Sequence, residues 1–246
     1  MKKRRTLLKL LALTLYSGTS FGDTLKLVTT DSPPYTYEHH PDRGAMTKIV
    51  EKSFKNRNHE ISITYKPWAR MLAEASTGKY DGILMLPYST EKNRAYFFST
   101  PILNTRIGFA MTEECHGKTE SPLHWHNVEI GCVKEYLNPG VFEKNAEKTV
   151  AISDNITGLR MLAGKRIKLL LIDENNFNAQ RNDITIPQRR ELRFCQTILE
   201  KIPLHLAIRK SLPNAEKTIR EFNTEIMKLQ SSGYIASVIS RTGIKQ

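Results

Sequence analysis

Strand patterns and helix patterns alternate along this chain in two successive sets, and that alternation limits the folds open to it. In the first set, short segments alternate apolar and polar residues, and the segments between them place apolar residues at helical spacing. The predicted elements are a strand at Leu25 to Thr29, a helix over Met46 to Phe54, a strand at Ile61 to Tyr65, a helix containing Met71 and Ala75 that stops at Gly78, and a strand at Gly82 to Leu86. Strands alternating with helices predict parallel βαβ units and therefore an α/β lobe.

The same pattern restarts in the second half of the chain. The predicted elements there are a strand at 128–133, a helix at 139–148, a strand at 150–153, a helix at 156–163 and a strand at 169–172. A second α/β lobe is implied. Two β-prone runs, Ile107 to Thr112 and His205 to Arg209, are predicted to carry the chain between the lobes as a two-strand hinge.

The two lobes and the C-terminal segment together give a domain plan. We expect residues 23–109 plus 206–246 to form the first lobe and residues 110–205 the second. Apolar residues from Ile219 to Leu229 recur at three- and four-residue spacing, which predicts an amphipathic helix that ends at Gly233 and packs on the first lobe. Ligands of open parallel sheets bind at the carboxyl ends of the strands, so the predicted site lies between the lobes.

The N-terminal segment has the three parts of a secretory signal. Basic residues from Lys2 to Arg5 precede an apolar run from Leu7 to Leu15, and Ser20-Phe21-Gly22 supplies the small residues of a cleavage site. The apolar run is shorter than the roughly 20 residues that span a bilayer, and Lys9 interrupts it. We predict a cleaved signal peptide over residues 1–22 and a periplasmic protein.

Composition restricts the partners. The chain carries a formal net charge of +12, and removal of the predicted signal peptide, with five basic and no acidic residues, lowers it to +7. The basic residues are scattered and form no nucleic-acid motif, so a solvated surface is predicted and nucleic-acid binding is not.

The cysteines and histidines indicate a disulfide or a metal site less clearly than the N-terminal segment indicates a signal peptide. Cys115, Cys132 and Cys195 in an oxidising compartment allow one disulfide and one thiol, and the sequence leaves the pairing open. His124 and His126, with His116 nearby, could share the face of a strand, but no further side chain follows at metal-ligand spacing. A surface loop is favoured there, and no metal or cofactor is predicted.

An ordered set of motifs spans nearly all of the chain after the leader. The motifs are Asp31-Ser32-Pro33-Pro34-Tyr35, Lys66-Pro67-Trp68-Ala69-Arg70, Gly78-Lys79-Tyr80-Asp81-Gly82, Thr90-Glu91-Lys92-Asn93-Arg94, Phe98-Ser99-Thr100-Pro101, Gly164-Lys165-Arg166 leading to Asp173, Ala207-Ile208-Arg209-Lys210-Ser211-Leu212-Pro213, Phe222-Asn223 and Ser232-Gly233-Tyr234. In their order and spacing they resemble family 3 of the bacterial extracellular solute-binding proteins, which are periplasmic receptors for polar amino acids. The resemblance implies a two-lobed type II periplasmic-binding fold.

The resemblance also implies roles for aromatic and acidic residues. Trp68 matches the aromatic that stacks on the ligand, and Tyr35 and Tyr37 lie where the family lines its cleft. Asp173 matches the acid that receives the ligand's ammonium, with a helix N-cap as the alternative. Asp31 could contact a ligand amine or could simply form a turn.

The carboxylate site departs from the family's pattern. The position of the ligand-binding arginine falls on Lys92, whereas the neighbouring arginine, Arg94, needs a slip of two residues, and Arg70 is a further candidate. Lys134, Glu135 and Tyr136 stand where many members present a glycine and a hydroxyl, and Met85-Leu86-Pro87 replaces the hydroxyls of the first lobe. Of these residues we expect Lys134 and Tyr136 to contact the ligand, at an altered carboxylate site.

The predicted function is therefore capture of a small polar ligand, an amino acid or a related compound, by a monomer that catalyses no reaction and delivers the ligand to an inner-membrane permease. A sensory or scavenging receptor without a permease is one alternative. A dehydratase-like enzyme is another, because burial could raise the pKa of the Glu135 or Glu174 carboxyl.

Overall fold

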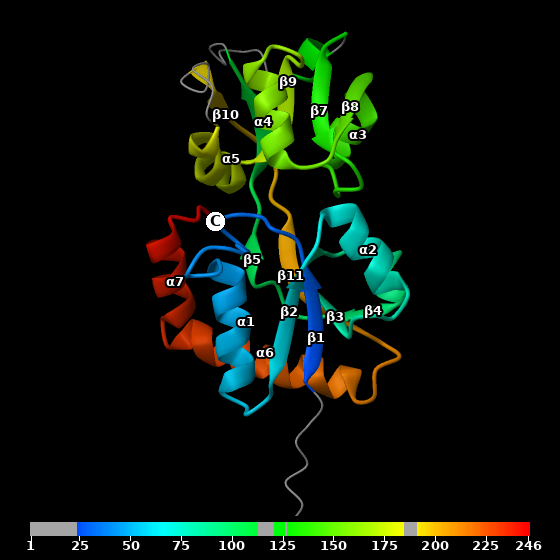
Figure 1. Cartoon of the computed structure of the whole chain (residues 1–246), viewed down its shortest axis with the longest axis vertical. Coiled ribbons are helices and arrows are strands. Elements are labelled where there is room, and N and C mark those ends of the chain that lie inside the picture. Colours follow the sequence, from blue (N-terminus) through cyan, green and yellow to red (C-terminus); the bar gives the residue numbers. More distant parts are fainter. Residues whose placement is uncertain (1–23, 113–120, 126, 185–190) are drawn as a thin grey trace, which may run out of the picture.

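The computed structural model describes residues 24–112, 121–125, 127–184 and 191–246. Two lobes lie one above the other along the long axis, and each is built on one β-sheet (Figure 1). The end of the chain lies beside the junction between the lobes (Figure 1). The predicted two-lobed α/β architecture is confirmed.

The first lobe contains the chain's first strands and its C-terminal helices. Its strands are β1 (Leu25–Thr29), β2 (Ile61–Tyr65), β3 (Gly82–Pro87), β4 (Tyr96–Phe98), β5 (Leu103–Asn104) and β11 (Pro203–Arg209), and its helices are α1 (Ala45–Lys55), α2 (Trp68–Ser76), the 3-10 helix η1 (Lys92–Arg94), α6 (Ala215–Ser231) and α7 (Tyr234–Thr242). The strand order is β2-β1-β3-β11-β4, with β5 paired to β11. β2, β1 and β3 run parallel, whereas β11 is antiparallel to β3.

The second lobe repeats the arrangement on a smaller scale. Its strands are β6 (Ile107–Met111), β7 (Glu129–Val133), β8 (Lys148–Ile152), β9 (Leu169–Asp173) and β10 (Arg193–Glu200), and its helices are α3 (Gly140–Asn145), α4 (Asn155–Ala163), α5 (Glu174–Gln180) and the 3-10 helices η2 (Pro122–Trp125) and η3 (Arg181–Asp183). The order is β10-β6-β9-β7-β8, with β8, β7 and β9 parallel. The carboxyl ends of β7 and β9 therefore meet at one edge of the sheet.

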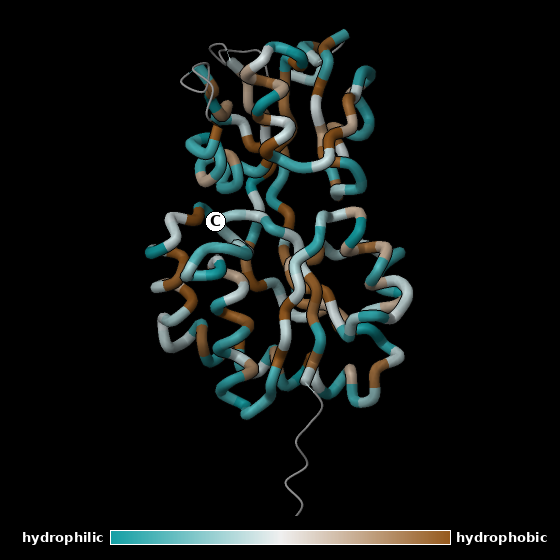
Figure 2. Tube along the Cα trace, viewed as in Figure 1, coloured by the Kyte–Doolittle hydropathy of each residue, from teal (hydrophilic) through white to brown (hydrophobic). Residues whose placement is uncertain are grey.

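Each lobe has its own hydrophobic core beside its sheet. The apolar segments concentrate in the strands and on the inner faces of the helices, and hydrophilic segments cover the outside (Figure 2). In the first lobe α1 packs against α6, with the rings of Phe54 and Phe222 5.5 Å apart. In the second lobe Trp125 packs edge-on against Phe109 at 5.0 Å. The predicted packing of the C-terminal helix on the first lobe is confirmed.

The two runs that were predicted to connect the lobes are instead strands inside the sheets. Ile107–Met111 is β6 of the second sheet, and His205 to Arg209 belongs to β11 of the first. The chain passes between the sheets shortly before each of these runs, at 105–106 and at 201–202. The two crossings bind each other there, because the Thr105 amide donates to the Ile202 carbonyl at 2.9 Å. The sheets thus divide the chain a few residues away from the expected lobe boundaries.

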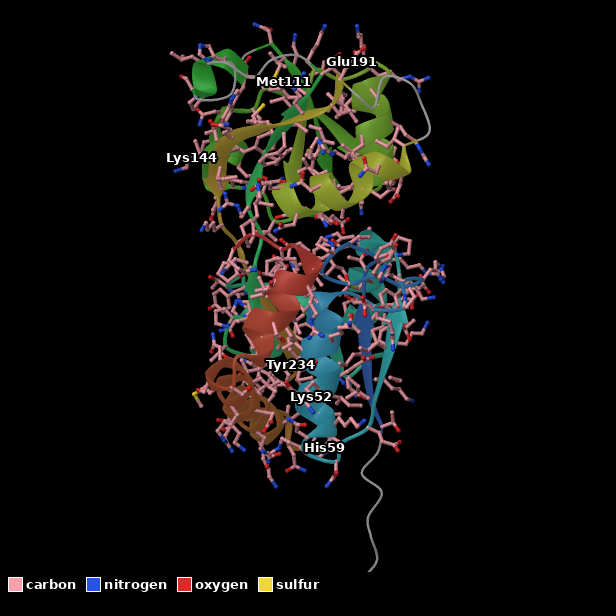
Figure 3. All side chains as sticks on the ribbon, turned by 90° about the vertical axis from the view of Figure 1, so that its left-hand side faces the viewer. Lys52, His59, Met111, Lys144, Glu191 and Tyr234 are labelled. Atoms are coloured by element: carbon pink, nitrogen blue, oxygen red, sulfur yellow. The ribbon has the colours of Figure 1, made fainter. Side chains whose placement is uncertain are left out.

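Some elements were not predicted, and one was predicted too long. The tail holds a further helix, α7, which begins at Tyr234 and rises along the first lobe toward the junction (Figure 3). β10 and α5 were not predicted either, and the helix expected over 139–148 ends at Asn145 because β8 starts at Lys148. Cys195 is disulfide-bonded and Cys132 is a free thiol, whereas Cys115 lies outside the described residues.

The predicted signal peptide lies outside the described residues. Within the described part of the chain no helix combines the length and the apolar character needed to cross a membrane.

Candidate functional site

An inner cavity lies between the lobes, where β3, β7 and β9 end. Its volume is about 60 Å³, and most of its wall is apolar. The side chains at the strand ends are Met85 and Pro87 of β3, Val133 of β7 and Asp173 of β9. The other lining residues are Ser32, Tyr35, Trp68, Thr105, Ile107, Tyr136, Leu137, Asn138, Asn155, Leu171, Ile172, Asn176, Ile202 and Leu204. The cavity therefore occupies the predicted position at the carboxyl ends of parallel strands.

A larger and more polar outer cleft adjoins this cavity. Its volume is about 520 Å³, which falls in the usual range of small-molecule sites. Both lobes line it, with charged side chains of both signs. The lining residues are Thr30, Asp31, Glu38, Tyr65, Lys66, Pro67, Trp68, Tyr136, Ser153, Asp154, Asn155, Ile156, Thr157, Arg160 and Gln180.

An aromatic pair stands between the two compartments. Trp68 and Tyr136 come from opposite lobes, line both compartments, and meet edge-to-face with ring centroids 4.7 Å apart. Trp68 is 6% exposed, and its indole Nε1–H donates to the Glu135 carbonyl at 2.9 Å. Trp68 sits at the first position of α2, directly after Pro67, whose fixed backbone suits a helix start. The pair therefore links the lobes at the boundary between the two compartments.

Two residues beside the cavities have left-handed backbone conformations. Met85 within β3 has φ 68° and Glu135 after β7 has φ 64°. Such angles are uncommon for residues other than glycine and tend to cluster at ligand sites. They fall in the two segments where the sequence departs from the family's hydroxyl pattern.

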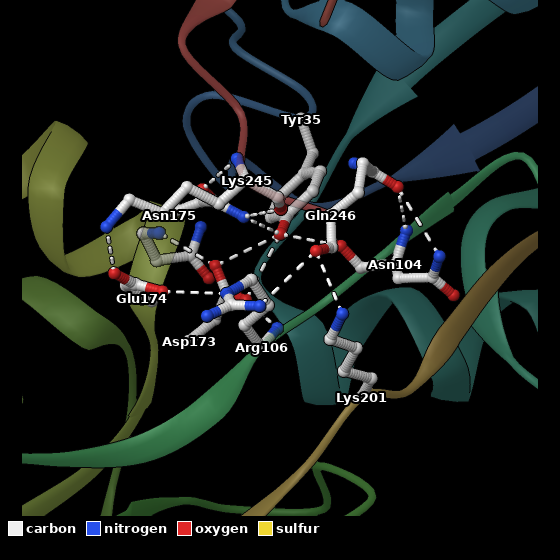
Figure 4. Close-up of polar contacts among 10 residues, drawn as sticks. Tyr35, Asn104, Arg106, Asp173, Glu174, Asn175, Lys201, Lys245 and Gln246 are labelled. Atoms are coloured by element: carbon white, nitrogen blue, oxygen red, sulfur yellow. Dashed lines mark hydrogen bonds and ion pairs between the residues drawn. The ribbon is translucent and has the colours of Figure 1, made fainter. Parts of the chain in front are cut away.

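Asp173 is the most heavily bonded group of the inner cavity. It is 4% exposed, and its carboxylate accepts the backbone amides of Arg106 at 2.6 Å and Asn176 at 2.8 Å. The hydroxyl of Tyr35, from the first lobe, lies 3.2 and 3.1 Å from its two oxygens (Figure 4). Asp173 thus serves as the N-cap of α5 and also holds the lobes together.

The network around Asp173 extends to the end of the chain. Asn175 donates to the Tyr35 hydroxyl at 2.7 Å and to the Lys245 carbonyl at 3.0 Å (Figure 4). Glu174 is paired with the Arg106 guanidinium at 2.8 Å and with the Lys245 ammonium. The first turn of α5 is consequently tied to the loop after β1, to a crossing segment and to the C-terminal segment.

Burial raises the pKa of the Asp173 carboxyl from 3.8 to about 6, because its hydrogen bonds only partly offset desolvation. The folded state therefore binds this proton more tightly than the unfolded state does. The stability that results is fully present below pH 3.8 and is lost as the pH rises through 6.

We expect the free energy of unfolding of the wild type, measured relative to Asp173→Asn, to fall by about 2–3 kcal/mol between pH 4 and pH 7. Urea unfolding at a series of pH values would measure this difference. Parallel pH profiles for the two proteins would contradict the assigned shift.

The structure brings half of the predicted site residues together. Tyr35, Trp68, Tyr136 and Asp173 line the inner cavity, and Asp31 lines the outer cleft with its Oδ1 accepting the Glu38 amide at 2.9 Å. Burial raises the pKa of the Tyr136 hydroxyl above its ordinary value.

The other half lie elsewhere. Arg70 pairs with Glu74 on α2 at 2.6 Å, and Tyr37 stacks on His40 with ring centroids 5.1 Å apart. Neither Lys92 nor Arg94, both in η1, lines either compartment, and Lys134 has a side chain that is 69% exposed. No lysine or arginine is among the described residues that line the inner cavity.

Several lining residues were missed by the sequence reasoning. Asn155, Lys66 and Asn176 each lie just after a strand, so the rule that ligands bind at strand ends could have identified them. Arg160 and Gln180 lie farther along α4 and α5, and their sequence context carries no comparable signal.

The enzyme alternative assumed that burial raises the pKa of the Glu135 or Glu174 carboxyl, and Glu174 does not support it. Burial opposes its ionisation, but Lys245 and Arg106 together hold the pKa of its carboxyl below the ordinary value. Glu135 lines neither compartment, and its side chain is 47% exposed. Among the described residues no three histidine, cysteine or acidic side chains are grouped to hold a metal, and His126 and His116 lie outside them.

Each lobe is built on one β-sheet, and the chain crosses between the lobes twice. Residues of both lobes line the cleft between them. This arrangement is the periplasmic-binding-protein fold. No protein-family model and no curated protein sequence matches the chain. The fold that the resemblance to family 3 implies is nevertheless confirmed by solved structures.

Three of these structures illustrate the similarity. The GluR0 ligand-binding core in complex with L-glutamate is 14% identical, has a TM-score of 0.74, and aligns over 89% of this chain and 98% of its own. The amino-acid ABC transporter substrate-binding protein AbpA of Streptococcus pneumoniae, bound to L-arginine, is 15% identical with a TM-score of 0.74, over 91% and 97%. A histidine kinase sensor domain is 13% identical with a TM-score of 0.74, over 89% and 95%.

Proposed function

We propose that this protein is an exported, non-catalytic solute-binding protein of the family 3 type, which captures a small polar ligand between its lobes. The supporting observation is the cleft itself. Tyr35 and Trp68 of the first lobe meet Asp173 and Tyr136 of the second around one cavity. A ligand that contacts both lobes binds the closed state more tightly than the open state, and this difference shifts the population toward closure.

A role in transport follows from the resemblance and from the predicted signal peptide. The closed surface would present the loaded protein to an inner-membrane permease, with the protein acting as a monomer. Some structural neighbours are transporter substrate-binding proteins and another is a kinase sensor domain, so a receptor that signals without a permease is the second candidate.

A thermal-shift panel on residues 23–246 tests the binding proposal. We expect one compound among amino acids, short peptides, amines and organic acids to raise the melting temperature. A ligand at 100 times its dissociation constant adds about 2.7 kcal/mol to the free energy of unfolding. Small-angle scattering with the same compound should show compaction. A panel without any shift and without compaction would overturn the proposal while leaving the fold intact.

A further inference from the structure

We propose that the boundary between the inner cavity and the outer cleft binds an uncharged amide group, and that the ligand is a short peptide or a capped amino acid with an apolar side chain. The amide would pair with Asn155 and Tyr136, and the apolar side chain would enter the inner cavity. This inference rests on the proposed function and names a ligand class for it.

Three side chains form this boundary. Among the described lining residues only Trp68, Tyr136 and Asn155 line both compartments. The indole Nε1–H of Trp68 is already donated to the Glu135 carbonyl, so Trp68 offers a ligand its apolar ring. Burial raises the pKa of the Tyr136 hydroxyl, which therefore stays protonated. A ligand group at the boundary thus meets three neutral side chains.

Asn155 is the clearest sign that a ligand group binds there. It is the first residue of α4, directly after the N-cap Asp154, and it is 6% exposed. Its side-chain amide forms no hydrogen bond with any described residue, and neither its Oδ1 nor its Nδ2 is sealed from the compartments. A buried amide without partners is unfavourable and uncommon in folded proteins. A ligand at the boundary can reach both atoms.

The Tyr136 hydroxyl is a second polar group without a partner. It forms no hydrogen bond with any described residue, and it also keeps accessible surface. Asn155 presents a donor and an acceptor side by side in one plane, and an amide of the ligand can pair with both through its own oxygen and N–H. The Tyr136 hydroxyl can donate to the same amide or accept from it. A carboxylate would leave the Asn155 oxygen unpaired, and an ammonium would leave its nitrogen unpaired.

The inner cavity favours an apolar group beyond that amide. Its wall is mostly apolar, with Met85 and Pro87 at the end of β3, and none of its described lining residues is a lysine or an arginine. The Asp173 carboxylate is already engaged by two backbone amides and by the Tyr35 hydroxyl. Since one water needs about 10–15 Å³, the cavity volume of about 60 Å³ admits a few non-hydrogen atoms. A charged group would be buried there without a counter-charge.

The remainder of the ligand would lie in the outer cleft, whose volume is about 520 Å³. Charged side chains of both signs line this cleft, so it can accept a neutral cap or a charged end of a peptide. Trp68 belongs to the first lobe, whereas Tyr136 and Asn155 belong to the second. A ligand held at the boundary therefore contacts both lobes and binds the closed state more tightly than the open state.

Titration calorimetry on the 23–246 protein tests the ligand class with four compounds that share one side chain. They are N-acetyl-leucinamide, N-acetyl-leucine, leucinamide and leucine, which are respectively uncharged, anionic, cationic and zwitterionic. The dipeptides Gly-Leu and Leu-Gly form the peptide arm, and the set is repeated with valine, methionine and phenylalanine in place of leucine. We expect the capped amide or a dipeptide of the best side chain to bind at least tenfold more tightly than the free amino acid.

Substitutions at the boundary test the site with the compound that binds best. Asn155→Leu should weaken binding at least tenfold and should leave the melting temperature of the free protein unchanged or higher, because Asn155 has no hydrogen bond to lose. Tyr136→Phe should weaken binding threefold or more. The matched control is Asn145→Leu, because Asn145 lies in the same lobe, lines neither compartment and donates to the Val141 carbonyl at 2.7 Å. Its affinity should stay within twofold.

Other results would overturn the inference. If a free amino acid binds as tightly as the capped amide and the dipeptides, or if Asn155→Leu and Tyr136→Phe retain wild-type affinity, the amide site is wrong and the proposed function stands. A lower melting temperature of Asn155→Leu with unchanged affinity would assign Asn155 a structural role. If no amide binds, the ligand class is wrong, and the amino acids, amines and organic acids of the thermal-shift panel decide the proposed function separately.

Discussion

Replacing Asp173 with alanine should lower the free energy of unfolding by about 2–4 kcal/mol. The substitution removes the N-cap of α5, whose loss alone costs about 1 kcal/mol. It also leaves the Arg106 amide, at a partly buried position, without its 2.6 Å acceptor, and an unsatisfied buried donor costs about 1–3 kcal/mol. Tyr35 loses one of its two second-lobe partners but keeps Asn175, whose amide donates to its hydroxyl at 2.7 Å, and the Asn104 carbonyl at 3.1 Å. The change therefore weakens both the second lobe and its link to the first.

The natural control is Asp154→Ala, because Asp154 also caps a helix of the second lobe. Its carboxylate accepts the Thr157 amide at 2.7 Å, but it lies at an exposed position outside the Asp173 network. We expect that variant to lose about 1 kcal/mol in urea unfolding near pH 7. Equal losses for the two variants would mean that Asp173 acts only as a helix cap, and its link between the lobes would then carry no measurable stability.

The parallel strands of both lobes could be predicted because burial decides their composition. β1 and β2 were predicted with their observed bounds, since period-two alternation at a half-buried strand is unambiguous. α5 was missed because its sequence, Glu-Asn-Asn-Phe-Asn-Ala-Gln, lacks apolar periodicity, and the fold stabilises it through the Asp173 cap and the C-terminal segment. The segments that cross between the lobes were predicted a few residues away from their observed positions for a similar reason. β6 and β11 are apolar because they lie inside sheets, whereas the actual connections are too short to leave a pattern.

The site could be predicted where a single residue type identifies it. Trp68 and Asp173 were predicted and line the inner cavity, because an aromatic at a helix start and an acid at the end of a strand mark the rim of a cleft. The bonds between Asp173 and Tyr35 could not be predicted, since these residues are 138 positions apart and come together only through the packing of two lobes. The positions of the basic residues relative to the two compartments could not be predicted for the same reason. The resemblance to the family places the ligand-binding arginine at Lys92 or Arg94, yet both residues lie in η1 and line neither compartment.

Variants of Trp68 allow the effect of a substitution on ligand affinity to be measured separately from its effect on folding. It lines both compartments and donates across the lobes to Glu135, so it lies at the proposed ligand position and also links the two lobes. The chain's other tryptophan, Trp125, is buried against Phe109 in the second lobe, 1% exposed, and its Nε1 has no hydrogen-bond partner. Trp125→Phe therefore loses no hydrogen bond, and it leaves Trp68 as the single tryptophan.

We expect Trp68→Ala to weaken binding of the best compound from the panel by about 30-fold or more, the usual loss for a central buried aromatic at a binding site. Trp68→Phe, which keeps a ring but loses the indole donor, should lose about 2–10-fold. Calorimetry gives both values, and Trp125→Phe should bind as the wild type does and change its emission when ligand is added. Circular dichroism at the assay temperature must show that each variant is folded. If Trp68→Ala folds and retains wild-type affinity, the ligand does not bind between these lobes at the aromatic pair, because any ligand enclosed there would lose its principal apolar wall.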